Sequence, residues 1–178
     1  MSMRKALIFI IFFTEIGSEA VAEPQYYAKA FAARASMDTY SSGVAAGLGF
    51  GKKLYQFIPH FVVEGEVSKS FSSLKLKQAT NPTKRSFTDA AVFGAFTFPV
   101  NYRYAVKGKL GFHYVSISDK VTDNTNNTST RNNSHDAGLE AGVGLVVTLD
   151  PRKDIVMEYT TNDTNDFSQL MLAFQFNY

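Results

Sequence analysis

The sequence predicts an all-β protein: an eight-stranded antiparallel up-and-down transmembrane β-barrel. Three observations predict it. Apolar residues alternate with period two in segment after segment, the residues between them are small with scattered charges, and the connections alternate between tight turns and long polar loops. The 178 residues include 16 Phe and 9 Tyr but no Cys, so the strand ladder and side-chain packing must hold the fold without disulfides.

The N-terminal segment has the order of a secretory signal. Basic residues at positions 4 and 5 precede the apolar run 6–13, and a small-residue Ala-Val-Ala sequence ends at Ala22. The apolar run is shorter than the roughly 20 residues that a membrane-spanning helix needs. The expected organisation is a cleavable signal peptide, residues 1–22, followed by one β-barrel domain, residues 23–178.

Alternation is clearest from Ala137 to Leu149, where every second residue is apolar. The same rule gives eight strands: 25–36, 42–54, 59–72, 86–98, 103–119, 136–149, 154–162 and 167–178. Tight turns are expected at 55–58, 99–102 and 150–153, and longer loops at 37–41, 73–85, 120–135 and 163–166. The segment 121–134 is almost entirely Asn, Thr, Ser and Asp, so it cannot bury a core and is expected to be a mobile loop.

The charged residues that alternate with the apolar ones indicate which face of each strand points into the barrel. Membrane barrels turn apolar residues outward and enclose polar ones, whereas soluble barrels do the reverse. Seven charged residues stand roughly six to ten residues above the tight-turn end, in a slab about 10 Å thick. They are Arg34, Glu64, Glu66, Lys107, Lys109, Glu140 and Glu158. We expect an ion-pair network that plugs the lumen, and a row of solvated surface charges is the alternative.

Aromatic residues gather near the predicted strand ends, as in the interfacial girdles of membrane barrels. The tight-turn end has Tyr26, Tyr27, Phe50, Tyr55, Phe57, Phe98, Tyr102, Tyr104, Phe176 and Tyr178. The opposite end has Tyr40, Phe71, Phe87, Tyr114 and Phe167. Two girdles would place the apolar band between them in lipid.

The last nine residues alternate apolar and polar positions and end in an aromatic residue: Leu170, Leu172, Phe174, Phe176 and Tyr178. This ending resembles the signal by which barrel-assembly machinery recognises outer-membrane proteins, although the family pattern more often ends in Phe. With the Gly-rich segment 45–51, the chain is similar to the small OmpA-type or porin-family barrels. OmpA-type proteins commonly add a peptidoglycan-binding domain, and this chain stops at the eighth strand, so that function is not implied.

The resemblance implies a bacterial outer-membrane location, reached by export through the inner membrane. Periplasmic chaperones and the assembly machinery would act as partners during biogenesis, and outer-membrane lipid and lipopolysaccharide would surround the barrel. A monomer is expected. The formal net charge of +2 is scattered along the chain, so a nucleic-acid partner gains no support.

No catalytic or metal motif stands out along the chain. His60, His113 and His135 are not at metal-ligand spacing, and no cofactor loop is present. In the run Ser134-His135-Asp136, neighbours on a strand would point to opposite faces, which argues against a catalytic triad. We therefore predict no enzyme, no cofactor and no metal site.

The predicted function is a structural and surface-interaction role, with polar loops displayed to a host or other extracellular ligand. Side chains just fill an eight-stranded lumen, so at most a small conductance is expected. An outer-membrane lipid-modifying enzyme and a soluble periplasmic lipocalin-like carrier are the alternatives.

Overall fold

The computed structural model describes residues 25–37, 40–75, 83–123, 128–163 and 167–178. The predicted signal peptide, residues 1–22, lies outside the described residues. Among the described residues, no helix has the length and apolar character required to cross a membrane.

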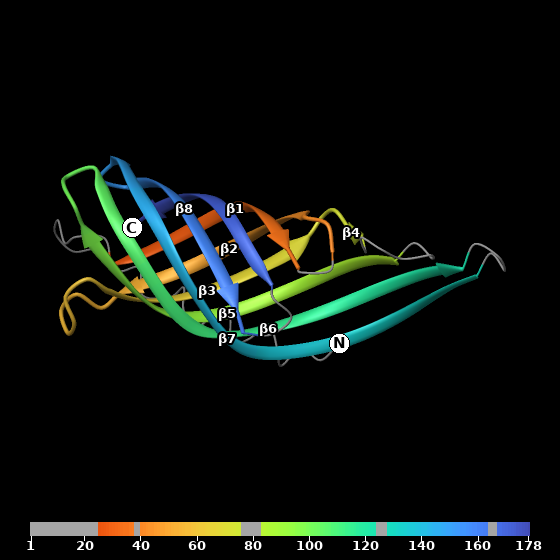
Figure 1. Cartoon of the computed structure of the whole chain (residues 1–178). Helices are drawn as coiled ribbons and strands as arrows, with labels where there is room; N and C mark the ends of the chain where they lie inside the picture. The colour runs from red at the N-terminus through yellow and green to blue at the C-terminus, as the bar shows by residue number, and fades with distance from the viewer. Residues whose placement is uncertain (1–24, 38–39, 76–82, 124–127, 164–166) are drawn as a thin grey trace.

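The described chain is a closed antiparallel barrel (Figure 1). Its strands are β1 (Tyr26–Ser36), β2 (Gly43–Lys53), β3 (Phe61–Ser70), β4 (Leu74–Lys75), β5 (Thr83–Pro99), β6 (Tyr104–Asp123), β7 (Thr128–Asp150), β8 (Lys153–Asn162) and β9 (Ser168–Asn177). The strand order is β3-β2-β1-β9-β8-β7-β6-β5-β4, and β3 also pairs with β5, which closes the barrel. The two-residue β4 only extends the edge of β5, so the eight predicted barrel strands are confirmed.

The longest strands form a hairpin that projects beyond the barrel wall (Figure 1). β6 and β7 pair without interruption from Tyr104↔Val147 to Asp123↔Thr128. The prediction of a loop over 120–135 was therefore wrong, because 120–123 and 128–135 are strand. A polar composition prevents burial of a core, but a solvated hairpin needs only its backbone ladder and a continuous register from the strands below.

The two faces of the wall have the predicted orientation. Leu139, Val143 and Leu145 are 45%, 63% and 37% exposed, whereas Glu64 and Lys109 are 0% and 5% exposed. Apolar side chains therefore point outward and the charged ones inward. This arrangement suits a barrel that meets lipid on its outside.

Apolar side chains also occupy the lumen at the end of the long loops. This loop-end apolar cluster comprises Met37, Tyr40, Leu74, Phe87, Ile117 and Phe167. The rings of Phe87 and Phe167 meet edge to face, with centroids 4.9 Å apart. Both had been expected in an outer girdle, as had Tyr40 and Tyr27, which are also buried inside. The girdle prediction was wrong for these four because nearness to a strand end does not fix the face, which depends on even or odd position along the strand.

Side-chain acceptors stabilise the tight turns at the other end. The Asn101 side chain accepts hydrogen bonds from the backbone N–H groups of Arg103 and Tyr104, at 2.8 and 2.9 Å. In the next turn, the Asp150 carboxylate accepts the Arg152 N–H at 2.9 Å. This hydrogen bond and the nearby Lys153 ammonium lower the pKa of Asp150, which lies outside the wall-spanning part of β7.

Candidate functional site: a layered lumen and a basic outer row

The centre of the lumen holds a buried network of three lysines and three glutamates, which we call the lumen network. Four strands supply it: Lys29 from β1, Glu64 and Glu66 from β3, Lys107 and Lys109 from β6, and Glu158 from β8. All six side chains are buried. Three positive and three negative charges cancel within the network.

Each lysine of the network contacts at least two glutamates. Lys109 Nζ lies 2.5 Å from Glu66 and 2.7 Å from Glu158. Lys107 Nζ lies 2.6 Å from Glu64 and 2.7 Å from Glu158. Multiple short charge-assisted hydrogen bonds offset the cost of removing these ions from water, and loss of one partner would leave a buried charge uncompensated.

Lys29 and a tyrosine complete the network from β1. Lys29 Nζ lies 2.7 Å from Glu66 and 2.9 Å from Glu64. The Tyr27 hydroxyl donates to Glu64 Oε2. A Cβ atom built on Gly49 would lie 2.8 Å from Lys29 Cε, so a glycine at this position gives the lysine stem its space.

The structure does not bring the seven sequence-predicted lumen residues together in one network. Glu64, Glu66, Lys107, Lys109 and Glu158 lie in the lumen network. The placement of Arg34 inside was wrong, because Arg34 is exposed on the outer face. Lys29 was missed. Alanines occupy both faces of β1, so hydrophobic alternation does not define its inner side, but Lys29 shares the parity of the buried Phe31.

Glu140 is buried but belongs to a second cluster, one level nearer the long loops. This acidic–histidine cluster comprises Asp89 from β5, His113 from β6 and Glu140 from β7. His113 Nδ1 lies 3.5 Å from Asp89 Oδ1. One ligand atom from each of the three residues falls within 4.8 Å of the others.

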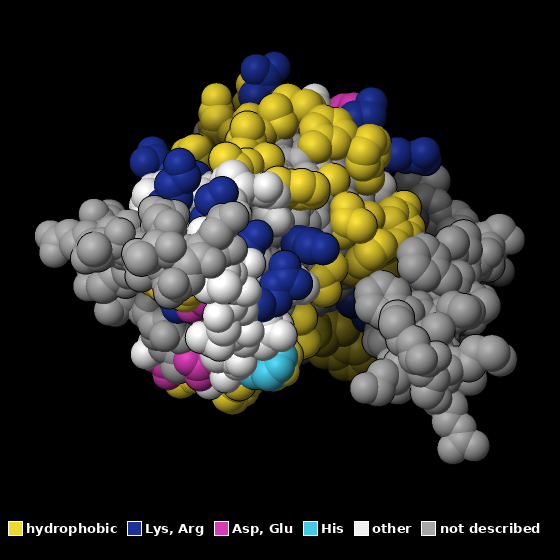
Figure 2. Space-filling model, turned by 90° about the vertical axis from the view of Figure 1, so that its right-hand side faces the viewer, with side chains coloured by type: hydrophobic (Ala, Val, Ile, Leu, Met, Phe, Trp, Pro, Cys, Tyr) yellow, Lys and Arg dark blue, Asp and Glu magenta, His cyan; other side chains and the backbone are white. Residues whose placement is uncertain are grey.

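Cations form a line across four neighbouring strands at the loop end. Register pairs Lys75 with Lys84, Lys84 with Lys120, and Lys120 with Arg131. All four side chains are exposed, and we call them the basic row. Within the part of the chain that the structure describes, none of the four forms an ion pair. Figure 2 views this end of the molecule, where Lys and Arg side chains spread widely and acidic side chains occupy small areas.

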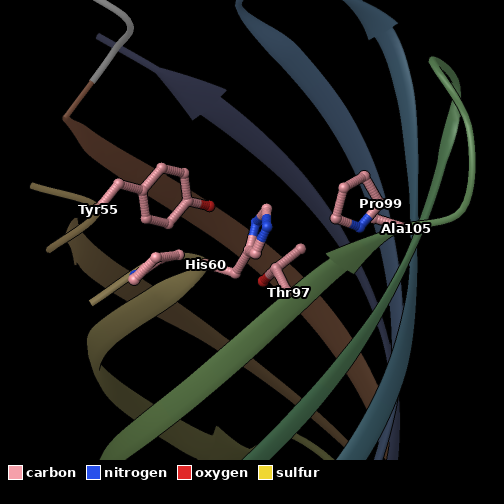
Figure 3. A pocket seen from close by; sticks show the side chains of 6 residues that line it. Tyr55, His60, Thr97, Pro99 and Ala105 are labelled. Atoms are coloured by element: carbon pink, nitrogen blue, oxygen red, sulfur yellow. The ribbon is translucent and has the colours of Figure 1, made fainter.

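A pocket of about 340 Å³ lies at the tight-turn end (Figure 3). Its lining is Tyr55, Pro59, His60, Thr97, Pro99 and Ala105. His60 has a φ of 65°, and its ring lies edge-on to that of Tyr55 at 5.9 Å. Apart from the His60 imidazole and the Tyr55 hydroxyl, the lining contains no ionisable side chain, so no carboxylate or lysine stands beside the imidazole in the pocket.

Two further sequence-predicted features lie on the outside. Leu170, Leu172, Phe174, Phe176 and Tyr178 are all exposed on the outer face of the last strand and its end. His135 is exposed and stacks on Tyr114, with ring centroids 5.8 Å apart.

Comparisons with known proteins agree with this geometry. A family model described as "Outer membrane protein beta-barrel domain" matches residues 6–178. No curated protein matches the chain. Among solved structures, Ail of Yersinia pestis is 16% identical, covers 88% of this chain and 99% of its own, and has a TM-score of 0.57.

Two other solved structures have the same architecture. Neisserial surface protein A is 16% identical, with 86% of this chain and 97% of that chain covered and a TM-score of 0.56. The outer membrane protein OprG from Pseudomonas aeruginosa is 12% identical, with 87% and 97% covered and a TM-score of 0.62. At these identities the likeness concerns the fold.

Proposed function

Because the chain belongs to the outer membrane protein beta-barrel domain family, we propose that it is a sealed barrel with a surface-interaction role. The ligands we propose are saccharides that carry phosphate or sulfate groups, bound by the basic row. The observation that carries the proposal is the direct pairing of cations across four strands.

Like charges placed directly opposite each other destabilise a sheet. Neighbouring strands lie about 4.8 Å apart, so the basic row presents four cations over roughly 14 Å. A ligand with several anionic groups would relieve the repulsion at all four positions at once. Two of the cations are Lys and Arg on the projecting hairpin, where solvent and large ligands reach them.

The height of the row suits saccharides better than lipid tails. On β6 the outward aromatic Tyr114 is followed on the same face by Ser116, Ser118 and then Lys120. Six residues correspond to about 20 Å along a strand. The row therefore stands beyond the apolar band, at the level of surface sugars.

One structural relative supports this ligand class. Ail has been crystallised in complex with the heparin analogue sucrose octasulfate, in a structure 16% identical to this chain with a TM-score of 0.54. Phosphorylated sugars of lipopolysaccharide share this anionic chemistry with sulfated glycans outside the cell.

Salt-dependent retention on immobilised heparin and on immobilised lipopolysaccharide tests the proposal. The variant Lys84→Gln/Lys120→Gln/Arg131→Gln should elute at clearly lower salt than the wild type. The matched control is Arg103→Gln/Arg152→Gln/Lys153→Gln, which removes three exposed cations at the tight-turn end. If the wild type is retained on only one of the two columns, that column identifies the source of the ligand. If both triple variants elute at the same salt concentration, the basic row is not the site.

Export and assembly are part of the same proposal. We propose that residues 1–22 are removed, so N-terminal sequencing of the outer-membrane form should begin at Glu23. The outward apolar residues of 170–178 would form the assembly signal. A Phe176→Ser/Tyr178→Ser variant should then fail to insert into the outer membrane, whereas Phe112→Ser should still assemble there.

The proposed role is non-catalytic. His135 packs on Tyr114 and belongs to an exposed hairpin. Lipid A from cells that express wild type or His135→Ala should be identical by mass spectrometry.

A further inference from the structure

We propose that Asp89, His113 and Glu140 form a binding site for a divalent transition-metal ion inside the lumen. The site lies between the lumen network and the loop-end apolar cluster. Zn²⁺ is the probe that we choose, because it accepts both imidazole nitrogen and carboxylate oxygen ligands.

Charge balance distinguishes this cluster from the lumen network beside it. In the lumen network, three lysine ammonium groups lie among the three glutamates and neutralise them. In the acidic–histidine cluster, Asp89 and Glu140 are 5% and 3% exposed. Lys109 is the neighbouring cation, but its hydrogen bonds go to Glu66 and Glu158. A divalent cation would balance the two carboxylates.

Unpartnered oxygen atoms point to a ligand independently of the charge. Asp89 Oδ1 and Glu140 Oε2 are buried and have no hydrogen-bond partner among the described residues. The hydroxyl group of Ser68 is also buried without a partner in the part of the chain that the structure describes. Ser68 is directly opposite Asp89, so it lies at the same level of the lumen. Buried polar groups are normally satisfied, and several unsatisfied ones at one level indicate a bound ion or water.

The geometry suits one metal ion. Ligand atoms around a single zinc ion lie about 3 to 4.4 Å apart, because each bond is about 2.0–2.2 Å long. The three candidate ligand atoms fall within 4.8 Å of one another, so small side-chain rotations would bring them to bonding distance. A hydroxyl group or water would complete the coordination. The three ligands come from three neighbouring strands, which is why spacing along the sequence does not reveal them.

Metal retention by the folded barrel tests the inference. The full chain is refolded into detergent micelles with Zn²⁺, free ion is removed, and bound zinc is measured by elemental analysis. We expect one zinc per barrel in the wild type and at least about tenfold less in Asp89→Asn/Glu140→Gln. The control His135→Gln removes an exposed imidazole and should keep the zinc. Heat-modifiable gel migration reports that each protein is folded.

Stability without metal supplies the second measurement. After refolding with a chelator, the wild type should unfold at no higher urea concentration than Asp89→Asn/Glu140→Gln, because two carboxylates then repel each other. Zinc should raise the midpoint of the wild type only. Zinc bound equally by the wild type and the double variant would overturn the inference. A chelated wild type that is clearly more resistant than the variant would also overturn it, by showing that the carboxylates are satisfied within the protein.

Discussion

The buried lysines are the residues on which the interior depends most. Each one lies between carboxylates from other strands, so its charge is compensated only while the barrel is closed. Removal of one partner from a buried ion pair typically costs about 3–5 kcal/mol, much more than the worth of an exposed pair.

We therefore expect Lys107→Met to lower the free energy of unfolding by about 3 kcal/mol or more, because Glu64 and Glu158 would remain charged without it. Urea unfolding in micelles measures this change. The control Lys153→Met removes an exposed cation paired with Asp150 at 3.1 Å and should cost less than about 1 kcal/mol. In Lys107→Met/Glu64→Gln, one charge of each sign is lost and part of the stability should return. This explanation would be contradicted if the double variant lost more free energy of unfolding than the two single variants lose together.

Two glycines of β6 offer a matched pair for testing close packing. A Cβ atom at Gly111 would collide with the Val92 carbonyl oxygen, whereas a Cβ atom at Gly108 would meet nothing within 4 Å. Gly111→Ala should lower the free energy of unfolding by about 2 kcal/mol or more, because backbone must move. Gly108→Ala should change it by less than about 0.5 kcal/mol. Equal urea midpoints for the two variants would show that the backbone around Gly111 can shift to make room for a methyl group without loss of stability.

At the scale of elements, the hairpin of β6 and β7 is separable from the barrel. Its outer part, from Lys120↔Arg131 to Asp123↔Thr128, contacts the rest of the wall only where Lys120 and Val121 pair with the first two residues of β5. We expect that replacing residues 120–131 with Asn-Gly, a favoured two-residue hairpin turn, leaves heat-modifiable migration and the urea midpoint unchanged. Heparin retention should fall because Lys120 and Arg131 are lost. A large drop in stability would instead show that the projecting part supports the wall.

Strand existence could be predicted from sequence because alternation reports the face of each strand directly. β7 and β9 alternate over their membrane-facing lengths, and both were found: β9 within one residue at each end, and β7 without its residues 128–135. The outer hairpin was missed because polar residues on both faces leave no period to detect. Lys29 was missed and Arg34 was wrongly placed inside because alanines on both faces of β1 hide its register, which is fixed only by pairing with β2 and β9.

The acidic–histidine cluster shows a different limit of prediction from sequence. Glu140 was correctly expected to face inward, but the same face holds two separate groups at different heights. Which group a residue joins depends on stagger between strands: His113 pairs with Gly138, so it stands diagonal to Glu140. Stagger is a property of the closed barrel, and neither composition nor period encodes it.

For the whole molecule, the lumen contains two layers of side chains in series, which we propose act as barriers. The lumen network crosses the centre, and the loop-end apolar cluster follows toward the long loops. The first barrier is ionic and the second is hydrophobic, so different changes weaken each one. A solute would have to pass both.

Two barriers in series predict a specific pattern of conductance in planar bilayers. Wild type, Lys109→Ala and Phe167→Ala should each show no sustained current, because one intact barrier remains in every case. Lys109→Ala/Phe167→Ala should conduct, since shortening both side chains removes an ammonium from the lumen network and a ring that packs on Phe87. The control Lys109→Ala/Phe112→Ala shortens an outward ring instead and should remain closed. If Lys109→Ala alone conducted as well as the double variant, the lumen network would be the single gate, and the apolar cluster would pack the loop end without sealing it.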